Sequence, residues 1–180
     1  METFDFREAR SKAMQIGLLG CAFWSGSFLL FVYTFPSFLS ELSTVLGLSS
    51  VAVIGGIVRR LRQENKSMNT LRCWWMTWFS FMCTVLLTTA VQYMYFAWLD
   101  NGRIWAKMGS LFASKEVVEV YTQAGASDML EQIQQLISEM PSLPVRDVVM
   151  SLMTSNLFIG FIFSVLSLLF IIGTRAGEKK

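Results

Sequence analysis

The chain has 180 residues, of which 53% are hydrophobic and 14% are aromatic, and its mean hydropathy is +0.48. Ordinary soluble domains are less apolar, so the composition argues against a soluble globular protein. The formal net charge of +2 is too small to favour a nucleic-acid partner. The length predicts a single domain, residues 1–180.

The charged residues are segregated along the chain. All 15 basic and all 13 acidic residues lie outside four uncharged stretches, residues 13–40, 42–58, 73–99 and 148–174. An ionised side chain at the centre of a bilayer costs roughly 2.5–3.5 kcal/mol even on insertion scales, so lipid explains this pattern. The sequence therefore predicts an integral membrane protein.

A helix needs about 20 residues to cross a hydrocarbon core of about 30 Å. Three of the uncharged stretches exceed that length, while the second is shorter and rich in Ser, Gly and Thr. We predict an all-α fold, an integral membrane four-helix bundle with a helical extracytoplasmic insert between its third and fourth helices. The predicted transmembrane helices are residues 13–35, 39–58, 73–99 and 148–172, and the insert is residues 100–147.

The first span follows a basic segment and contains two patterns. Residues 18–21, Leu-Leu-Gly-Cys, match a bacterial lipoprotein cleavage box that would lipidate Cys21. The chain stays apolar as far as Phe35, however, which favours an uncleaved helix. Small residues also recur every four positions in the first and last spans, which predicts close helix packing: Ala13, Gly17, Cys21 and Ser25, and Asn156, Gly160 and Ser164.

Basic residues flank the first two spans, which sets their orientation. If both clusters stay in the cytoplasm, an even number of crossings must separate them, so the chain is expected to turn near Pro36. The same rule places residues 100–147 outside and both termini in the cytoplasm. The residues concerned are Arg7, Arg10 and Lys12; Arg59, Arg60, Arg62, Lys66 and Arg72; and the tail residues Arg175, Lys179 and Lys180.

Two amides stand among apolar residues in the third and fourth spans. Gln92 lies seven residues before the end of the third stretch, and Asn156 lies eight residues after the start of the fourth. Both are therefore about 10–12 Å deep, and we predict a hydrogen bond between them. Such a bond is worth about 0.6–1.7 kcal/mol in membranes, so a structural role is expected, with a polar ligand site as the alternative.

The insert is predicted to contain two amphipathic helices. Apolar residues recur at helical spacing from Ile104 to Phe112 and from Met129 to Met140, with Gly125 allowing a turn and Pro141 ending the second helix. We expect their apolar faces to lie on the bundle or in the lipid interface. The alternative is that they bind a partner helix. The candidate partner-binding face is Ile104, Trp105, Met108, Met129, Ile133, Leu136 and Met140.

The borders of the insert carry charge. Asp100 and Arg146 are expected to pair with each other. Asp147 suits the start of the fourth span, because a helix N-terminus stabilises negative charge.

No catalytic or metal-binding pattern is present in the sequence. Histidine is absent, and Cys21, Cys73 and Cys83 lie in or beside the spans without the paired spacing of zinc or iron-sulfur sites. Walker, G-x-G-x-x-G and G-x-S-x-G motifs are also absent. We therefore expect no catalytic residues, no metal, no cofactor and no enzymatic activity.

Several features together resemble a family of bacterial membrane proteins known as domain of unknown function 4199. These are the tight first hairpin, the Gly-Gly-Ile-Val-Arg-Arg exit at residues 55–60, the aromatic run at 93–98 followed by Asp100, and the final span through Gly160. The family usually has Asp-Pro where this chain has Asp100-Asn101. The resemblance implies a four-helix protein of the bacterial inner membrane and no known activity.

The functional expectation is a non-enzymatic interaction or accessory subunit that acts through the insert. Its expected partners are the lipid bilayer and either another protein or a second copy of the chain. The alternative is a small-solute or lipid transporter formed by an oligomer, with Ser50 and Gly55 along its route. A third hypothesis, an enzyme using external carboxylates such as Asp100 and Glu116, has no convincing spacing behind it.

Overall fold

The computed structural model describes residues 6–65 and 68–172, and over these ranges the chain is helical and has no strand. Lys66, Arg175, Lys179 and Lys180, which entered the orientation argument, lie outside the described residues. The main helices are α1 (Phe6–Thr34), α2 (Leu39–Glu64), α3 (Thr70–Met94), α4 (Arg103–Phe112), α5 (Lys115–Gln123), α6 (Ser127–Glu139) and α7 (Val145–Ile172). A π-helical turn, η1 (Tyr95–Leu99), follows α3, and a 3-10 turn, η2 (Met140–Ser142), follows α6.

Four segments are long and apolar enough to cross a membrane, namely Arg7–Thr34, Leu39–Glu64, Thr70–Leu99 and Val145–Leu169. The four predicted spans are therefore helices, and the chain turns between Thr34 and Leu39, next to Pro36. Helices α1 and α2 extend beyond the predicted borders because a helix can continue in water once its charged side chains are paired. Glu8 pairs with Lys12, and Arg60 pairs with Glu64, each one helical turn apart.

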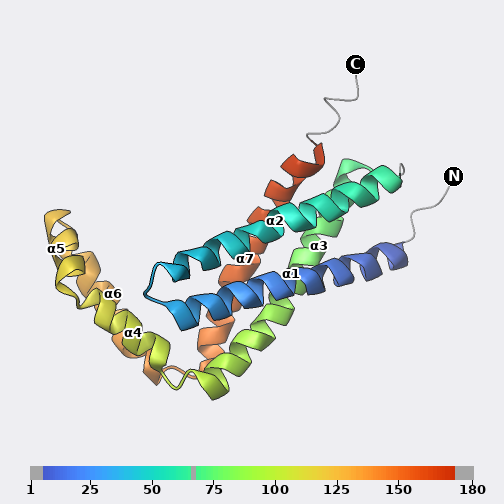
Figure 1. Ribbon diagram of the computed structural model, residues 1–180. Helices are drawn as coiled ribbons and strands as arrows, with labels where there is room; N and C mark the ends of the chain where they lie inside the picture. The colour runs from blue at the N-terminus through green and yellow to red at the C-terminus, as the bar shows by residue number, and fades with distance from the viewer. Residues whose placement is uncertain (1–5, 66–67, 173–180) are drawn as a thin grey trace.

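The four long helices form a bundle in which α3 packs on α1 and α7, while α2 packs on the same two helices from the other side (Figure 1). The starts of α1 and α3 and the ends of α2 and α7 lie at one end of the bundle. The α1–α2 turn, the end of α3 and the start of α7 lie at the other end. Each long helix therefore runs along the bundle in the direction opposite to that of the previous one.

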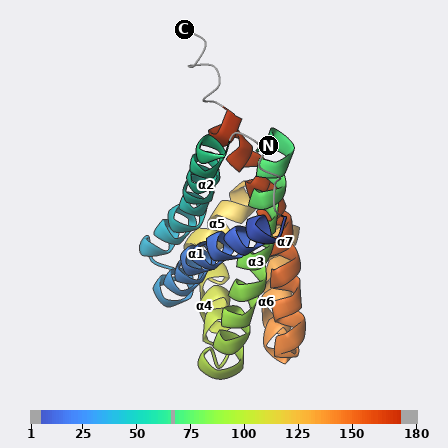
Figure 2. The ribbon, with the colours of Figure 1, turned by 90° about the vertical axis from the view of Figure 1, so that its right-hand side faces the viewer.

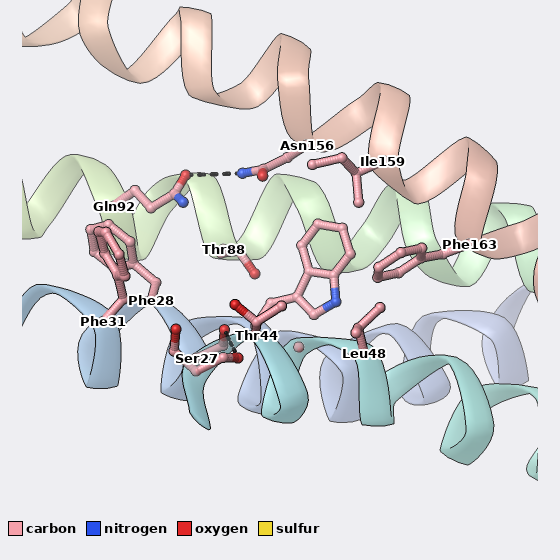
Figure 3. Close-up of a pocket in the computed structure, with 13 residues that line it drawn as sticks. Ser27, Phe28, Phe31, Thr44, Leu48, Thr88, Gln92, Asn156, Ile159 and Phe163 are labelled. Carbon is pink, nitrogen blue, oxygen red and sulfur yellow. Dashed lines mark hydrogen bonds between the residues drawn. The ribbon is translucent and has the colours of Figure 1, made fainter. Parts of the chain in front are cut away.

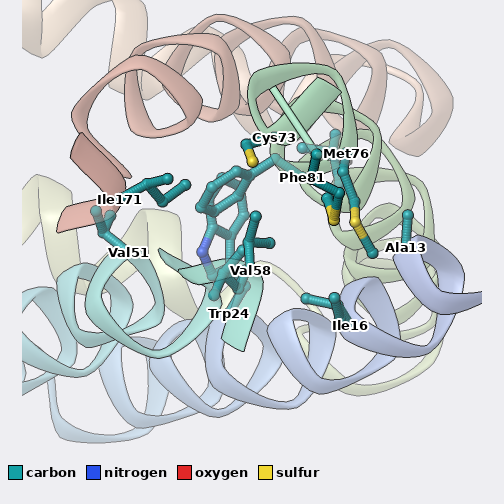
Figure 4. Packing of buried hydrophobic residues seen from close by; sticks show 12 residues of the cluster. Ala13, Ile16, Trp24, Val51, Val58, Cys73, Met76, Phe81 and Ile171 are labelled. Carbon is teal, nitrogen blue, oxygen red and sulfur yellow. The ribbon is translucent and has the colours of Figure 1, made fainter. Parts of the chain in front are cut away.

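The bundle core is built around Phe81 of α3, which lies beside Trp24 in Figure 4 and also contacts the ring of Phe163. The Phe81 centroid lies 6.2 Å from that of Trp24 and 6.0 Å from that of Phe163. Trp24 Nε1 donates a hydrogen bond to Ser50 Oγ at 3.0 Å. This bond satisfies the indole N–H, which would otherwise be costly to bury.

Glycines bring α1 and α3 into close contact. A Cβ atom on Gly17 would lie 2.6 Å from Cys83 Cβ and 2.8 Å from the backbone oxygen of Ser80. Thr84 Oγ1 donates a hydrogen bond to the Gly17 carbonyl oxygen at 3.0 Å. The small residues at positions 13 and 17 are buried in this contact, so they pack helices together as predicted.

The insert contains three helices rather than the predicted two, because residues 115–123 form α5. Helices α4 and α6 pack against each other, and α5 connects them at the far end of the insert (Figures 1 and 2). The turn between α5 and α6 uses a positive φ of 66° at Gly125, as the sequence indicated. Helix α6 ends at Glu139, just before Pro141.

The predicted pair of Asp100 with Arg146 is wrong. Asn101 and Gly102 have φ values of 46° and 76°, and this left-handed turn folds the backbone around the Asp100 carboxylate. The carboxylate accepts hydrogen bonds from Tyr95 Oη, Gly102 N and Ile104 N, each at 3.1 Å. Arg146 instead contacts Asp147, which lies in the first turn of α7 as expected.

Candidate functional site

The expected hydrogen bond between Gln92 and Asn156 is present and connects α3 to α7 (Figure 3). Asn156 Nδ2 donates to Gln92 Oε1 at 3.3 Å, and Gln92 is 5% exposed. Two amides that share one hydrogen bond leave one NH₂ group and one carbonyl oxygen for other partners. Within the described chain neither Gln92 Nε2 nor Asn156 Oδ1 has a partner, so both remain available.

The amide pair lines a cavity of about 300 Å³ between α1, α2, α3 and α7, which we call the amide cavity. Its polar lining consists of hydroxyl and amide groups, and none of its lining residues is charged. Aromatic and aliphatic side chains form the remaining walls. The lining residues are Trp24, Ser27, Phe28, Phe31, Ser43, Thr44, Gly47, Leu48, Thr88, Gln92, Asn156, Ile159 and Phe163.

Thr88 presents an unsatisfied hydroxyl to the amide cavity. The residue is 1% exposed, and its Oγ1 has no hydrogen-bond partner in the described structure. Four other hydroxyls along α3 donate to the backbone carbonyl four residues earlier, namely those of Thr77, Ser80, Thr84 and Thr89. Figure 3 shows the Thr88 hydroxyl in the space between α3 and the first two helices.

Two hydroxyls on the opposite wall, those of Ser27 and Ser43, already have acceptors, and the third, that of Thr44, belongs to an exposed residue. Ser27 Oγ donates to the Ser43 carbonyl oxygen at 2.6 Å, and Ser43 Oγ donates to the Ser40 carbonyl oxygen. Among the buried and half-buried lining residues, the unused hydrogen-bonding capacity is therefore concentrated on Thr88, Gln92 and Asn156.

The structure divides the candidate partner-binding face between two surfaces. Ile104 is buried against Val32 and Tyr95, so it anchors α4 on the bundle. Trp105 stacks on Phe96 of η1, with ring centroids 6.0 Å apart, and Met108 is half-buried nearby. These three residues attach the insert to the bundle and do not belong to an open face.

The remaining four residues form a separate stripe on α6. Met129 and Leu136 are 59% and 56% exposed, and Ile133 and Met140 are half-buried. Leu130 and Ile137, one position further along, are buried. We call Met129, Ile133, Leu136 and Met140 the α6 stripe.

The alternative hypothesis, a transporter formed by an oligomer, has Ser50 and Gly55 along its route, and within a single chain both residues are buried. Ser50 is fully buried, accepts a hydrogen bond from Trp24 and donates to the Gly47 carbonyl oxygen. Gly55 is also buried. Both residues pack helices together in the bundle.

Among the residues that the structure describes, no three of the types His, Cys, Asp and Glu are grouped so as to hold a metal ion. The three cysteines are free thiols and lie in α1 and α3. The carboxylate of Asp100 is occupied by its three hydrogen bonds at the start of the insert.

No protein-family model matches the chain, and neither the curated proteins nor the solved structures include a significant match to it.

Proposed function

We propose that this chain is a non-enzymatic accessory subunit of the bacterial inner membrane that binds a helix of another protein on the α6 stripe. The single observation that carries this proposal is the exposure of Met129 and Leu136, one face of an ordered helix that the rest of the insert leaves uncovered. Methionine-containing apolar stripes adapt well to the surface of a partner helix.

The geometry of α6 defines the borders of the stripe. At 100° per residue, Met129, Ile133, Leu136 and Met140 all lie within about 60° of one another on the helix surface. Leu130 and Ile137 lie on the side that packs toward α4. Exposed polar residues border the other side, among them Asp128 and Glu139. The α6 stripe is thus a narrow apolar surface with acidic residues along one edge.

Charge favours a protein over an anionic lipid surface as the occupant of the stripe. Residues 115–140, which contain α5 and α6, have one basic residue and five acidic residues. Helices that lie on anionic membranes are instead rich in Lys and Arg, because headgroups repel acidic side chains. We therefore propose a partner helix with an apolar face and flanking basic residues.

The orientation is part of the same proposal. The basic clusters of α1 and α2 lie at the bundle end opposite to the insert, and a positive-inside arrangement would place that end and both termini in the cytoplasm. The resemblance to domain of unknown function 4199 supports a bacterial inner membrane through the sequence features given above.

Labelling with a membrane-impermeant maleimide tests the orientation. Single cysteines at Gln123 and Glu64, both exposed, would be introduced into a variant with Cys21, Cys73 and Cys83 replaced by alanine. In intact spheroplasts we expect the Gln123→Cys variant to be labelled and the Glu64→Cys variant to be labelled only after lysis. The reverse pattern would overturn the orientation.

Photo-crosslinking in native membranes tests the partner. A photoreactive amino acid at Leu136 should give one adduct with a different protein, and the crosslinked peptide should be a helix flanked by Lys or Arg. The matched control carries the same group at Glu131, which is exposed on the opposite side of α6 and should give no such adduct. An adduct between two copies of this chain, adducts with lipid alone, or equal adducts at both positions would each contradict the proposal.

A further inference from the structure

We propose that the amide cavity is a binding site for the head of an uncharged lipid, one that carries a free hydroxyl group and an ester carbonyl, as mono- and diacylglycerols do. This inference is independent of the α6 stripe. It rests on where the cavity opens, on the unused hydrogen-bonding groups inside it, and on the absence of charge in its lining.

The cavity opens sideways, between α2 and α7. These helices are joined toward one end of the bundle, where Ser167 Oγ donates to the Val51 carbonyl oxygen at 3.3 Å and Arg62 Nη1 donates to that of Ile171 at 3.4 Å. Toward the other end they separate, and Figure 2 shows the start of α2 and the start of α7 well apart. Exposed residues that also line the cavity mark this opening: Thr44, Leu48 and Ile159.

The depth of this opening places its mouth against lipid. Gln92 lies seven residues before the end of the span that finishes at Leu99, or about 10 Å along a helix. At that depth a gap between two membrane-spanning helices faces acyl chains rather than water. A ligand that enters here therefore comes from the bilayer and has an apolar part.

The groups inside the cavity specify a polar head that both donates and accepts hydrogen bonds. Gln92 supplies an amide N–H, Asn156 supplies a carbonyl oxygen, and Thr88 supplies a buried hydroxyl. A buried polar group without a partner costs about 1–3 kcal/mol, so a ligand that satisfies these groups is stabilised. An ester carbonyl can accept from Gln92, and a glycerol hydroxyl can donate to Asn156.

Because the lining of the cavity carries no charge, it favours the binding of a neutral lipid over that of a phospholipid. A phosphate buried at this depth would need basic side chains around it, because an unpaired charge is expensive to desolvate. None of the lining residues is basic. The volume of about 300 Å³ suits a glycerol-sized head, with the acyl chain leaving through the opening beside Leu48 and Ile159.

The test uses the full chain in phosphatidylcholine vesicles that contain a monoacylglycerol with a photoactivatable diazirine near the head of its acyl chain. We expect adducts to map to residues around the opening, such as Leu48 and Ile159. Unlabelled diacylglycerol should compete for the site, whereas phosphatidic acid should not. Equal competition by phosphatidic acid, or labelling spread evenly along the outer surfaces of the helices, would overturn the proposal.

Two matched variants test whether the lipid head binds at Thr88 in the amide cavity. Thr88→Val removes the unsatisfied hydroxyl at nearly constant shape, and we expect about tenfold less labelling, the equivalent of one hydrogen bond. Thr89→Val is the control, because the Thr89 hydroxyl donates to the Val85 carbonyl oxygen and Thr89 does not line the cavity. This control should be labelled like the unmodified chain.

A third variant shows whether the cavity itself is needed. Ile159→Trp adds bulk at the opening and should abolish labelling. Because Thr88→Val removes an unsatisfied buried hydroxyl, the thermal stability of this variant should be unchanged or higher. A loss of labelling in this variant would therefore report loss of lipid binding and not unfolding. If Thr88→Val and Ile159→Trp are labelled like the unmodified chain, as the Thr89→Val control is, the proposal fails.

Discussion

Replacing Phe81 by alanine should lower the free energy of unfolding by about 3 kcal/mol, the low end of the range for Phe→Ala in soluble cores. The low end applies because, in lipid, the transfer of the side chain out of water contributes little, while the packing loss and the cavity remain. Phe81 is 1% exposed and packs between Trp24 and Phe163. Helices from three sides hold this space open, so it cannot collapse.

Phe158→Ala is the matched control for Phe81→Ala. Phe158 is 68% exposed on α7, where lipid or detergent replaces its contacts, so this variant should unfold like the unmodified chain. Unfolding in mixed micelles with increasing dodecyl sulfate, followed by tryptophan fluorescence, measures both. Equal destabilisation by the two substitutions would contradict the packing shown in Figure 4.

The number and order of the spans could be predicted because the bilayer constrains them so strongly. A charged residue within the hydrocarbon region is costly, so the uncharged stretches coincide with α1, α2, α3 with η1, and α7. Their ends were less predictable. Backbone hydrogen bonding continues beyond the uncharged stretches wherever pairs such as Glu8–Lys12 support another turn.

The insert was predictable in its helical periodicity but not in its packing. Apolar residues at helical spacing identify α4 and α6, yet the spacing does not say which neighbour covers each side. Ile104 is covered by the bundle and Ile137 by α4, while Leu136 is left exposed. Helix α5 was missed because it has nine residues, three of which are valine, a residue that favours strands.

The candidate site, too, could be predicted only in part. Gln92 and Asn156 could be paired from sequence because depth in a membrane follows directly from position in a span. The unsatisfied hydroxyl of Thr88 could not be foreseen, since Thr84 and Thr89 lie in equally apolar surroundings and yet bond to their own helix. The difference depends on side-chain rotamers and on neighbours brought from α1, α2 and α7.

Gly17→Ala should lower the free energy of unfolding by about 1–3 kcal/mol, the usual effect of overpacking a tight contact. The added methyl group would meet Cys83 Cβ at 2.6 Å and the Ser80 backbone oxygen at 2.8 Å. Neither is the end of a flexible side chain, so α1 must move away from α3. That movement also stretches the hydrogen bond from Thr84 to the Gly17 carbonyl oxygen.

Gly56→Ala provides the control, because nothing lies within 4 Å of a Cβ atom placed at that glycine in α2. Alanine is favoured over glycine inside a helix by about 0.5–1 kcal/mol, so this variant should be as stable as the unmodified chain or more so. The same dodecyl sulfate titration measures both changes. If Gly17→Ala also raised stability, the added methyl group would be gaining contacts without displacing α1, and the close approach of α1 and α3 could not be correct.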